Sequence, residues 1–82
     1  MSAPVSFAQF LVSLGSSAMV HLGETADPAS GGKQANPMMA RHTLDLLTLL
    51  KTKTDGNLDD DEARLLDALI GEVSEKLAAL EG

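Results

Sequence analysis

Aliphatic side chains recur every three or four residues in three separate stretches of the chain, and this spacing constrains the fold more than any other feature. Such recurrence is typical of amphipathic helices, because one helical turn takes 3.6 residues, whereas a half-buried strand alternates with a period of two. The composition agrees, since the chain contains fourteen Leu, two Phe and no Trp or Tyr, a mixture that favours helices over strands. We therefore predict an all-α fold.

Start signals mark the three predicted helices. Each start combines a capping residue with a partner that suits the first helical turn. The pairs are Ser6 with Gln9, Asn36 with Pro37, and Asp59 with Glu62. We expect helices over residues 6–23, 37–53 and 59–80, and the last two should form a helical hairpin across the corner at 55–58.

The length of the chain, 82 residues, leaves room for one domain, which we assign to residues 1–82. The segment 24–35 contains Pro28, Ser30 and two Gly and keeps no apolar period, so we expect a flexible connector there. In so short a chain the entropy lost on folding nearly cancels the gain from burial, and self-association becomes an expected stabilising device.

The predicted middle helix is apolar over most of its circumference. One face carries Met39, Thr43, Leu46, Leu47 and Leu50, with Leu44 off one side of it and Leu49 off the other. A helix of this kind must be covered on several sides, which two partner helices from a short chain hardly achieve. We therefore expect a homo-oligomer, a dimer in the first place, that completes the helical bundle. Its predicted interface consists of Met39, Leu44, Leu47, Leu49 and Leu50.

Charge is divided unevenly along the chain, whose net charge is −6. Residues 1–54 carry four basic and three acidic side chains, whereas residues 55–82 carry two basic and nine acidic ones. The acidic half would repel a phosphate backbone or an anionic membrane surface, so neither nucleic acid nor membrane is an expected partner. The apolar-leaning stretch 5–22 lacks a positively charged leader, and the chain has no Cys, so we expect a cytoplasmic protein.

The segment TDGNLDDDE, residues 54–62, invites comparison with a calcium-binding loop. Gly56, Leu58 and Glu62 have the spacing of such a loop. The first and third positions, however, would fall on Lys51 and Lys53, where the ion needs carboxylates. A capped helix–turn–helix corner explains the same residues.

The two imidazoles of the chain each have a carboxylate three residues later. His21 precedes Glu24 and His42 precedes Asp45, so these four side chains could meet at a metal ion if the helices packed suitably. The spacing does not require it, and a partly buried His bonded to its helix neighbour is the favoured interpretation. The chain also has no nucleophile-elbow, phosphate-loop or dinucleotide-binding glycine motif. We therefore assign no catalytic, cofactor-binding or metal residue and do not expect an enzyme.

Three blocks of the sequence carry a resemblance to a known family: SFAQFLVSLGSSAMVHLGE near the start, ARHTLDLLTLL, and KTDGNLDDDEARLLDAL. The chain resembles a small family of bacterial proteins of unknown function, the domain of unknown function 1844. The stretch GEVSEKLAAL departs from the Arg- and Tyr-containing ending of the relatives. The resemblance implies a small, soluble, all-helical bacterial protein, and it brings no catalytic residues.

These features favour a non-catalytic, homo-oligomeric interaction module. Two alternatives stay open: an accessory subunit that docks a larger, basic protein through the acidic C-terminal helix, or a small metal-dependent protein that uses His21 and His42.

Overall fold

The computed structural model describes residues 6–26 and 29–81. In these ranges it contains three α-helices and no strand: α1 (Phe7–His21), α2 (Pro37–Lys53) and α3 (Asp60–Glu81). The predicted all-α, three-helix fold is confirmed. Every helix end lies within two residues of its predicted position.

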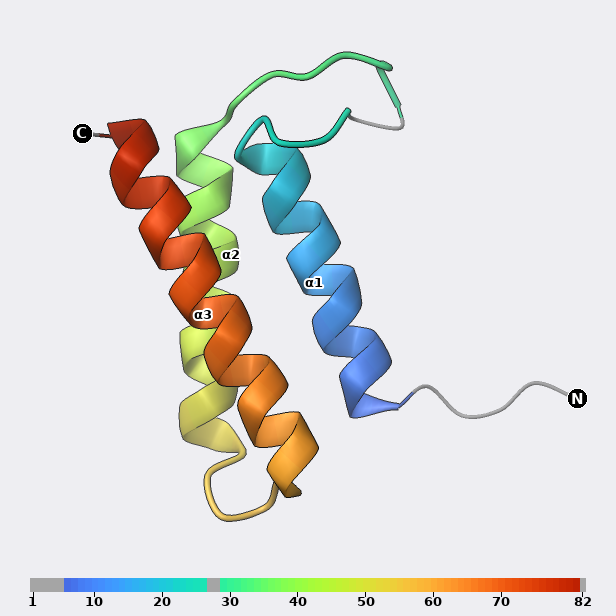
Figure 1. Ribbon diagram of the computed structural model, residues 1–82, viewed down its shortest axis with the longest axis vertical. Coiled ribbons are helices and arrows are strands. Elements are labelled where there is room, and N and C mark those ends of the chain that lie inside the picture. The colour runs from blue at the N-terminus through green and yellow to red at the C-terminus, as the bar shows by residue number, and fades with distance from the viewer. Residues whose placement is uncertain (1–5, 27–28, 82) are drawn as a thin grey trace, which may run out of the picture.

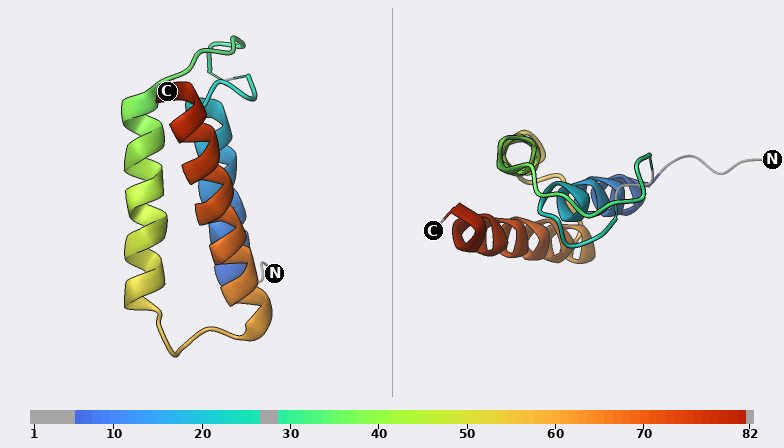
Figure 2. Two further views of the ribbon diagram at one scale, coloured as in Figure 1. Left: turned by 60° about the vertical axis from the view of Figure 1, so that its left-hand side comes forward. Right: turned by 90° about the horizontal axis from the view of Figure 1, so that it is seen from above.

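The helices run alternately up and down, so that α2 is antiparallel to both α1 and α3 (Figure 1). Each helix contacts the other two. Seen from above, α1 and α3 lie next to each other and α2 lies to one side of them, so the three helices form a triangle (Figure 2). The α2–α3 hairpin that the sequence predicts is present, and α1 packs across it.

The core lies along the centre of this triangle, and each helix with its cap contributes three buried apolar residues. They are Leu11, Ala18 and Leu22, then Ala40, Leu44 and Leu47, then Leu66, Val73 and Leu77. The buried hydroxyl of Thr43 donates a hydrogen bond to the carbonyl of Met39 at 3.1 Å, so its burial leaves no unsatisfied polar group. Burial of these aliphatic side chains is the main force that holds the helices together.

The buried face of α2 differs from the predicted one and requires a correction. The sequence places Leu44 off the main apolar face, but Leu44 and Ala40 are buried and Met39 is exposed. The part of the α2 surface that is buried is the part that faces α1 and α3. A sequence pattern gives only the average direction of all apolar side chains on the helix, which need not coincide with it. The covered arc is therefore rotated toward Leu44.

The capping signals form as predicted. Ser6 Oγ accepts from the N–H of Gln9 at 3.0 Å, while Gln9 Oε1 accepts from the N–H of Ser6 at 3.2 Å. The same reciprocal pair joins Asp59 and Glu62, at 2.8 and 3.0 Å. The Asp59 and Glu62 carboxylates thus serve a helix start, and the segment 54–59 is the helix corner that the sequence predicts.

A glycine turn ends α1 and joins it to the start of α2. Gly23 has a φ of +78°, and the N–H groups of Gly23 and Glu24 donate to the carbonyls of Val20 and Met19. This pattern is a Schellman motif, which favours glycine at the left-handed position. The N–H of Asn36 donates to the carbonyl of His21 at 2.6 Å, so the two ends of the connector meet.

A second glycine brings α1 and α3 together. Gly15 is buried, and a Cβ atom at this position would lie 2.9 Å from Cδ2 of Leu69. The missing side chain of Gly15 therefore permits the close packing of α1 against Leu69 of α3. None of the described helices is long and apolar enough to cross a membrane.

Candidate functional site

The predicted interface residues of α2 occupy three different environments. Leu44 and Leu47 are buried by the chain's own helices, so they offer no surface to a partner. Leu50 is half-buried, whereas Met39 and Leu49 are exposed, Leu49 to 52%. Met38 beside them is the most exposed large apolar residue described, at 79%. The candidate surface of α2 is therefore its outer side rather than its whole circumference.

Two ion pairs fix the flank of α2 that faces α3. They are Arg41 Nη2 with Glu81 Oε1 at 3.0 Å, and Lys51 Nζ with Asp67 Oδ1 at 2.7 Å. The other flank of the buried arc faces α1. At 3.6 residues per turn, this flank carries Met39, Leu46 and Leu50. Leu49 lies at the outer edge of this second flank.

The close contact of Gly15 with Leu69 shows which flank of α1 faces α3 and therefore which flank faces α2. Val12 lies on the flank toward α3, while Phe10 and Leu14 lie on the flank toward α2. Phe10 is 43% exposed, and its ring centroid is 6.3 Å from that of Phe7. Phe10 and Leu14 of α1 therefore face the same side as Met39, Leu46 and Leu50 of α2, whereas Val12 does not. We call this surface the α1/α2 face and define it by Phe10, Leu14, Met39, Leu46, Leu49 and Leu50.

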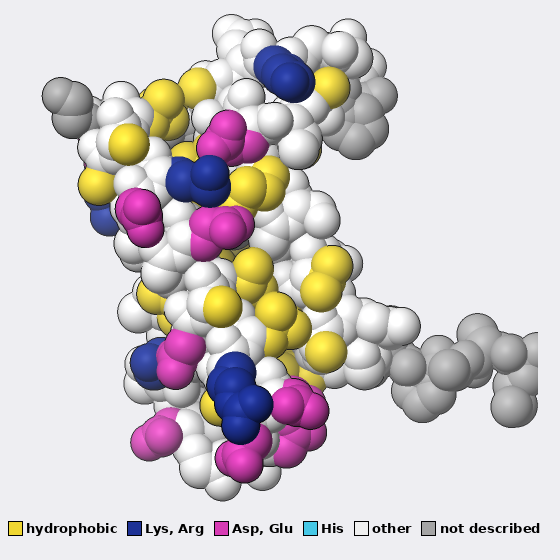
Figure 3. Space-filling model, viewed as in Figure 1, with side chains coloured by type: hydrophobic (Ala, Val, Ile, Leu, Met, Phe, Trp, Pro, Cys, Tyr) yellow, Lys and Arg dark blue, Asp and Glu magenta, His cyan; other side chains and the backbone are white. Residues whose placement is uncertain are grey.

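Helix α1 has no Asp, Glu, Lys or Arg among its fifteen residues. Its exposed positions are Ser, Gln, Phe and Val. Figure 3 shows charged side chains over α3 and near the connector, whereas the visible surface of α1 carries none. The absence of charge between Phe7 and His21 is the signal that could have identified α1 as a candidate surface.

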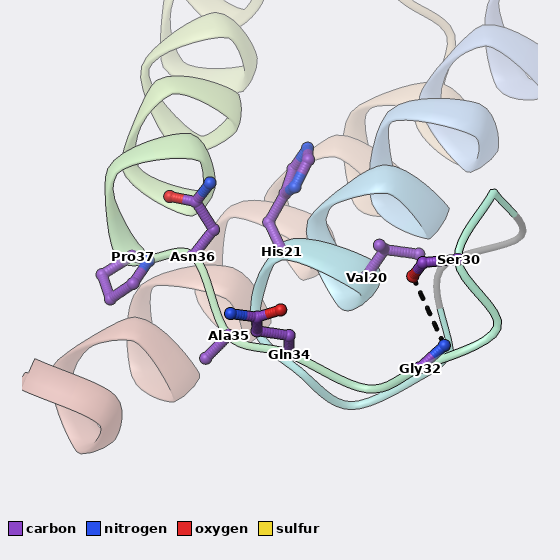
Figure 4. Close-up of a pocket in the computed structure, with 8 residues that line it drawn as sticks. All are labelled: Val20, His21, Ser30, Gly32, Gln34, Ala35, Asn36 and Pro37. Carbon is purple, nitrogen blue, oxygen red and sulfur yellow. Dashed lines mark hydrogen bonds between the residues drawn. The ribbon is translucent and has the colours of Figure 1, made fainter.

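A polar cavity of about 490 Å³ opens where the connector meets the ends of α1 and α2. Its lining includes His21, Ser30, Gln34 and Asn36 (Figure 4). The Ser30 hydroxyl accepts from the N–H of Gly32 at 3.4 Å, and the Asn36 side chain accepts from the N–H of Met39. Both side chains thus stabilise local backbone, and the described residues of the lining include no carboxylate or Lys that would complete a catalytic set around His21.

The four residues of the metal hypothesis do not form one site. No group of three or more His, Cys, Asp or Glu residues in the described ranges could hold a metal ion. Glu24 instead pairs with Lys76 of α3, at 2.7 Å between Oε1 and Nζ. Nothing in the packing of α1 and α2 therefore supports metal binding by His21, His42, Glu24 and Asp45.

The Glu24–Lys76 pair should give stability a specific pH dependence. The hydrogen bond and the charge of Lys76 lower the pKa of Glu24 below its ordinary 4.5, and Glu24 in turn raises the pKa of Lys76 above 10.5. The unfolded chain binds the Glu24 proton more readily than the folded chain does. The contribution of the pair is therefore present above pH 4.5 and is lost as the pH falls through the lowered pKa of Glu24. At the basic end it is lost as the pH rises through the raised pKa of Lys76.

A carboxyl-carbon NMR titration tests this expectation directly. The Glu24 carboxyl should titrate at a lower pH in the natural sequence than in Lys76→Gln. Lys51→Gln, which removes a cation of the α2–α3 pair, serves as the control and should leave Glu24 unchanged. Equal Glu24 pKa values in the natural sequence and Lys76→Gln would mean that the pair does not persist in solution.

Comparison with known proteins identifies one family. The family model described as Domain of unknown function (DUF1844) matches residues 4–78. No curated protein and no solved structure matches the chain.

Proposed function

The chain belongs to the DUF1844 family, and we propose that it is a non-catalytic interaction module that assembles with further copies of itself, a dimer in the first place. The proposal places it in the cytoplasm, with neither nucleic acid nor membrane as a partner. Its non-catalytic character is supported by the sequence, which offers neither a Cys nucleophile nor a phosphate-loop or nucleophile-elbow motif.

One observation carries the proposal: large apolar side chains remain exposed together on the outer side of α2. A single exposed Leu is ordinary in a soluble protein, but several on one surface indicate an interaction site. Met38, Met39 and Leu49 are exposed within three turns of one helix. Covering them with a second chain would remove this apolar area from water, and each fully buried side chain of this size contributes about 1.5–3 kcal/mol.

Leu49→Asp should dissociate the assembly without unfolding the chain. A charge at an apolar interface loses its water shell and finds no partner, whereas at an exposed position of a monomer it stays hydrated. Light scattering coupled to size exclusion should therefore give the mass of one chain, 8.6 kDa, for the variant and a multiple for the natural sequence. Refractive index must be the concentration signal, because the chain has no Trp or Tyr.

Thr48→Asp provides the matched control for Leu49→Asp. Thr48 is the exposed neighbour on the same helix but lies away from the α1 flank, so its variant should keep the natural mass. Identical masses for the natural sequence and both variants would remove the outer side of α2 from the interface.

A second candidate function is supported by the charge of α3. This helix carries seven acidic and two basic residues, and only Asp67 and Glu81 pair with α2. Glu72 and Glu75 face solvent, and such a surface suits a basic partner protein. In a pull-down, recovery of that partner should fall with added salt, and recovery that does not change with salt would argue against this mode.

A further inference from the structure

We propose that two copies of the chain join through the α1/α2 face, so that α1 supplies part of the interface together with α2. This inference rests on the proposed function and adds a specific surface and a specific occupant to it. The interface then includes Phe10 and Leu14 of α1 as well as Met39, Leu46 and Leu49 of α2.

The composition of the α1/α2 face is that of an interface centre. Charged residues are depleted at the centres of protein interfaces, and aromatic residues and Met are enriched there. Helix α1 contributes no charged side chain to this face. On α2, Arg41 and Lys51 are held on the other flank by Glu81 and Asp67 of α3. Among the described residues of α2, Lys53 at the last turn lies between the lines of Leu46 and Leu49, and Asp45 lies one turn before Leu49 at the outer edge, so the face carries one charge of each sign.

The distribution of charge favours a second copy of this chain as the occupant. The net charge of −6 makes two copies repel, so they can meet closely only where the acidic residues are remote. Helix α3, with seven acidic residues, lies on the opposite side of the core from the α1/α2 face, which is turned away from the viewer in Figure 1. A strongly charged partner would find only Lys53 and Asp45 on this face, whose opposite charges cancel, whereas a second copy brings the same apolar surface without net charge.

The size of the face is adequate for a dimer. Helices of fifteen and seventeen residues are about 22 and 26 Å long and each about 10 Å wide, so together they offer about 500 Å² in projection. The accessible area of such a ridged surface is larger than its projection. It therefore approaches the roughly 800 Å² per partner that a standard stable interface buries. A two-fold arrangement uses the same patch on both copies, so each substitution changes the interface at two symmetry-related places.

Phe10→Asp and Val12→Asp form the matched pair that tests this inference. The two residues belong to the same turn of α1 and have similar exposure, 43% and 55%, but Val12 lies on the α3 flank. Light scattering over about a hundredfold range of concentration gives the dissociation constant of each variant. We expect Phe10→Asp to raise it by about a hundredfold or more, since two like charges would meet in the interface. We expect Val12→Asp to leave the constant within about threefold of the natural value.

A salt series gives an independent readout on the natural sequence. Because the α1/α2 face is neutral and the rest of each copy is acidic, screening should leave the dissociation constant unchanged or lower it between about 0.05 and about 0.5 M NaCl. A constant that rises with salt would indicate an interface held by ion pairs and would overturn the inference.

The outcomes separate the failure of this inference from that of the proposed function. A natural chain that stays monomeric over the whole range overturns both. A dimer dissociated by Leu49→Asp but not by Phe10→Asp keeps the proposed function and overturns the role of α1. Equal effects of Phe10→Asp and Val12→Asp would also overturn it. Circular dichroism reports folding, and if Phe10→Asp loses its helices, Phe10→Ser replaces it with the same expected direction.

Discussion

Leu47→Ala should lower the free energy of unfolding by about 2–5 kcal/mol, the usual cost of removing a fully buried Leu side chain from a helical core. Leu47 has no exposed surface and lies at the centre of the arc that α2 buries between α1 and α3. Urea denaturation followed by circular dichroism measures this loss. Because small domains have only about 5–15 kcal/mol of stability in total, a change of this size should be evident even at moderate temperature.

Leu80→Ala is the control for the same substitution at an exposed site. Leu80 is 41% exposed near the end of α3 and lies outside the α1/α2 face, so its truncation should cost less than about 1 kcal/mol. The loss in Leu47→Ala should also be independent of protein concentration. If Leu47 instead contacted another copy, as the sequence predicts, the loss would depend on concentration through the dimer equilibrium.

The ends of the helices could be predicted from the sequence because their causes are local. Ser6 with Gln9 and Asp59 with Glu62 form reciprocal hydrogen bonds over three residues, and no distant part of the chain is needed for them. The same holds for Asn36, whose side chain accepts from the N–H of Met39. The helical spacing of the apolar residues and the capping residues together therefore predicted the all-α fold.

Which side of each helix is buried could not be predicted equally well. It depends on where the neighbouring helices lie, and the sequence pattern does not give their positions. In α2 the apolar residues surround most of the axis, and only the positions of α1 and α3 decide that Leu44 is buried while Leu49 is exposed. The absence of charge in α1 was visible in the sequence, but it is equally compatible with a helix buried in its own chain. The exposure of Phe10 distinguishes the two.

This difference bears on how the proposed interface is specified. The residues that build the core and those proposed to contact a second copy alternate along the same two helices, for example Leu47 and Leu49 on α2 or Leu11 and Phe10 on α1. Any change in the angle between α1 and α2 would therefore move both sets together. The contacts that fix this angle should matter for assembly as well as for folding.

Gly23→Ala should disturb one of these contacts and lower the free energy of unfolding by about 1–3 kcal/mol. A side chain in the left-handed region costs about 1–2 kcal/mol. The added Cβ would also lie 3.2 Å from the backbone N of Ala35, at the point where the connector returns to α2. Thermal denaturation followed by circular dichroism measures the effect.

Gly56→Ala separates the two causes of the Gly23→Ala loss. Gly56 has nearly the same φ, +80° against +78°, but a Cβ there would have no atom within 4 Å. Its variant should therefore show the cost of the backbone conformation alone, and Gly23→Ala should be the less stable of the two. Only Gly23→Ala should also weaken self-association, because Gly23 and the Asn36–His21 hydrogen bond hold the ends of α1 and α2 together. Equal losses at both positions would mean that the contact with Ala35 does not restrain the two helices.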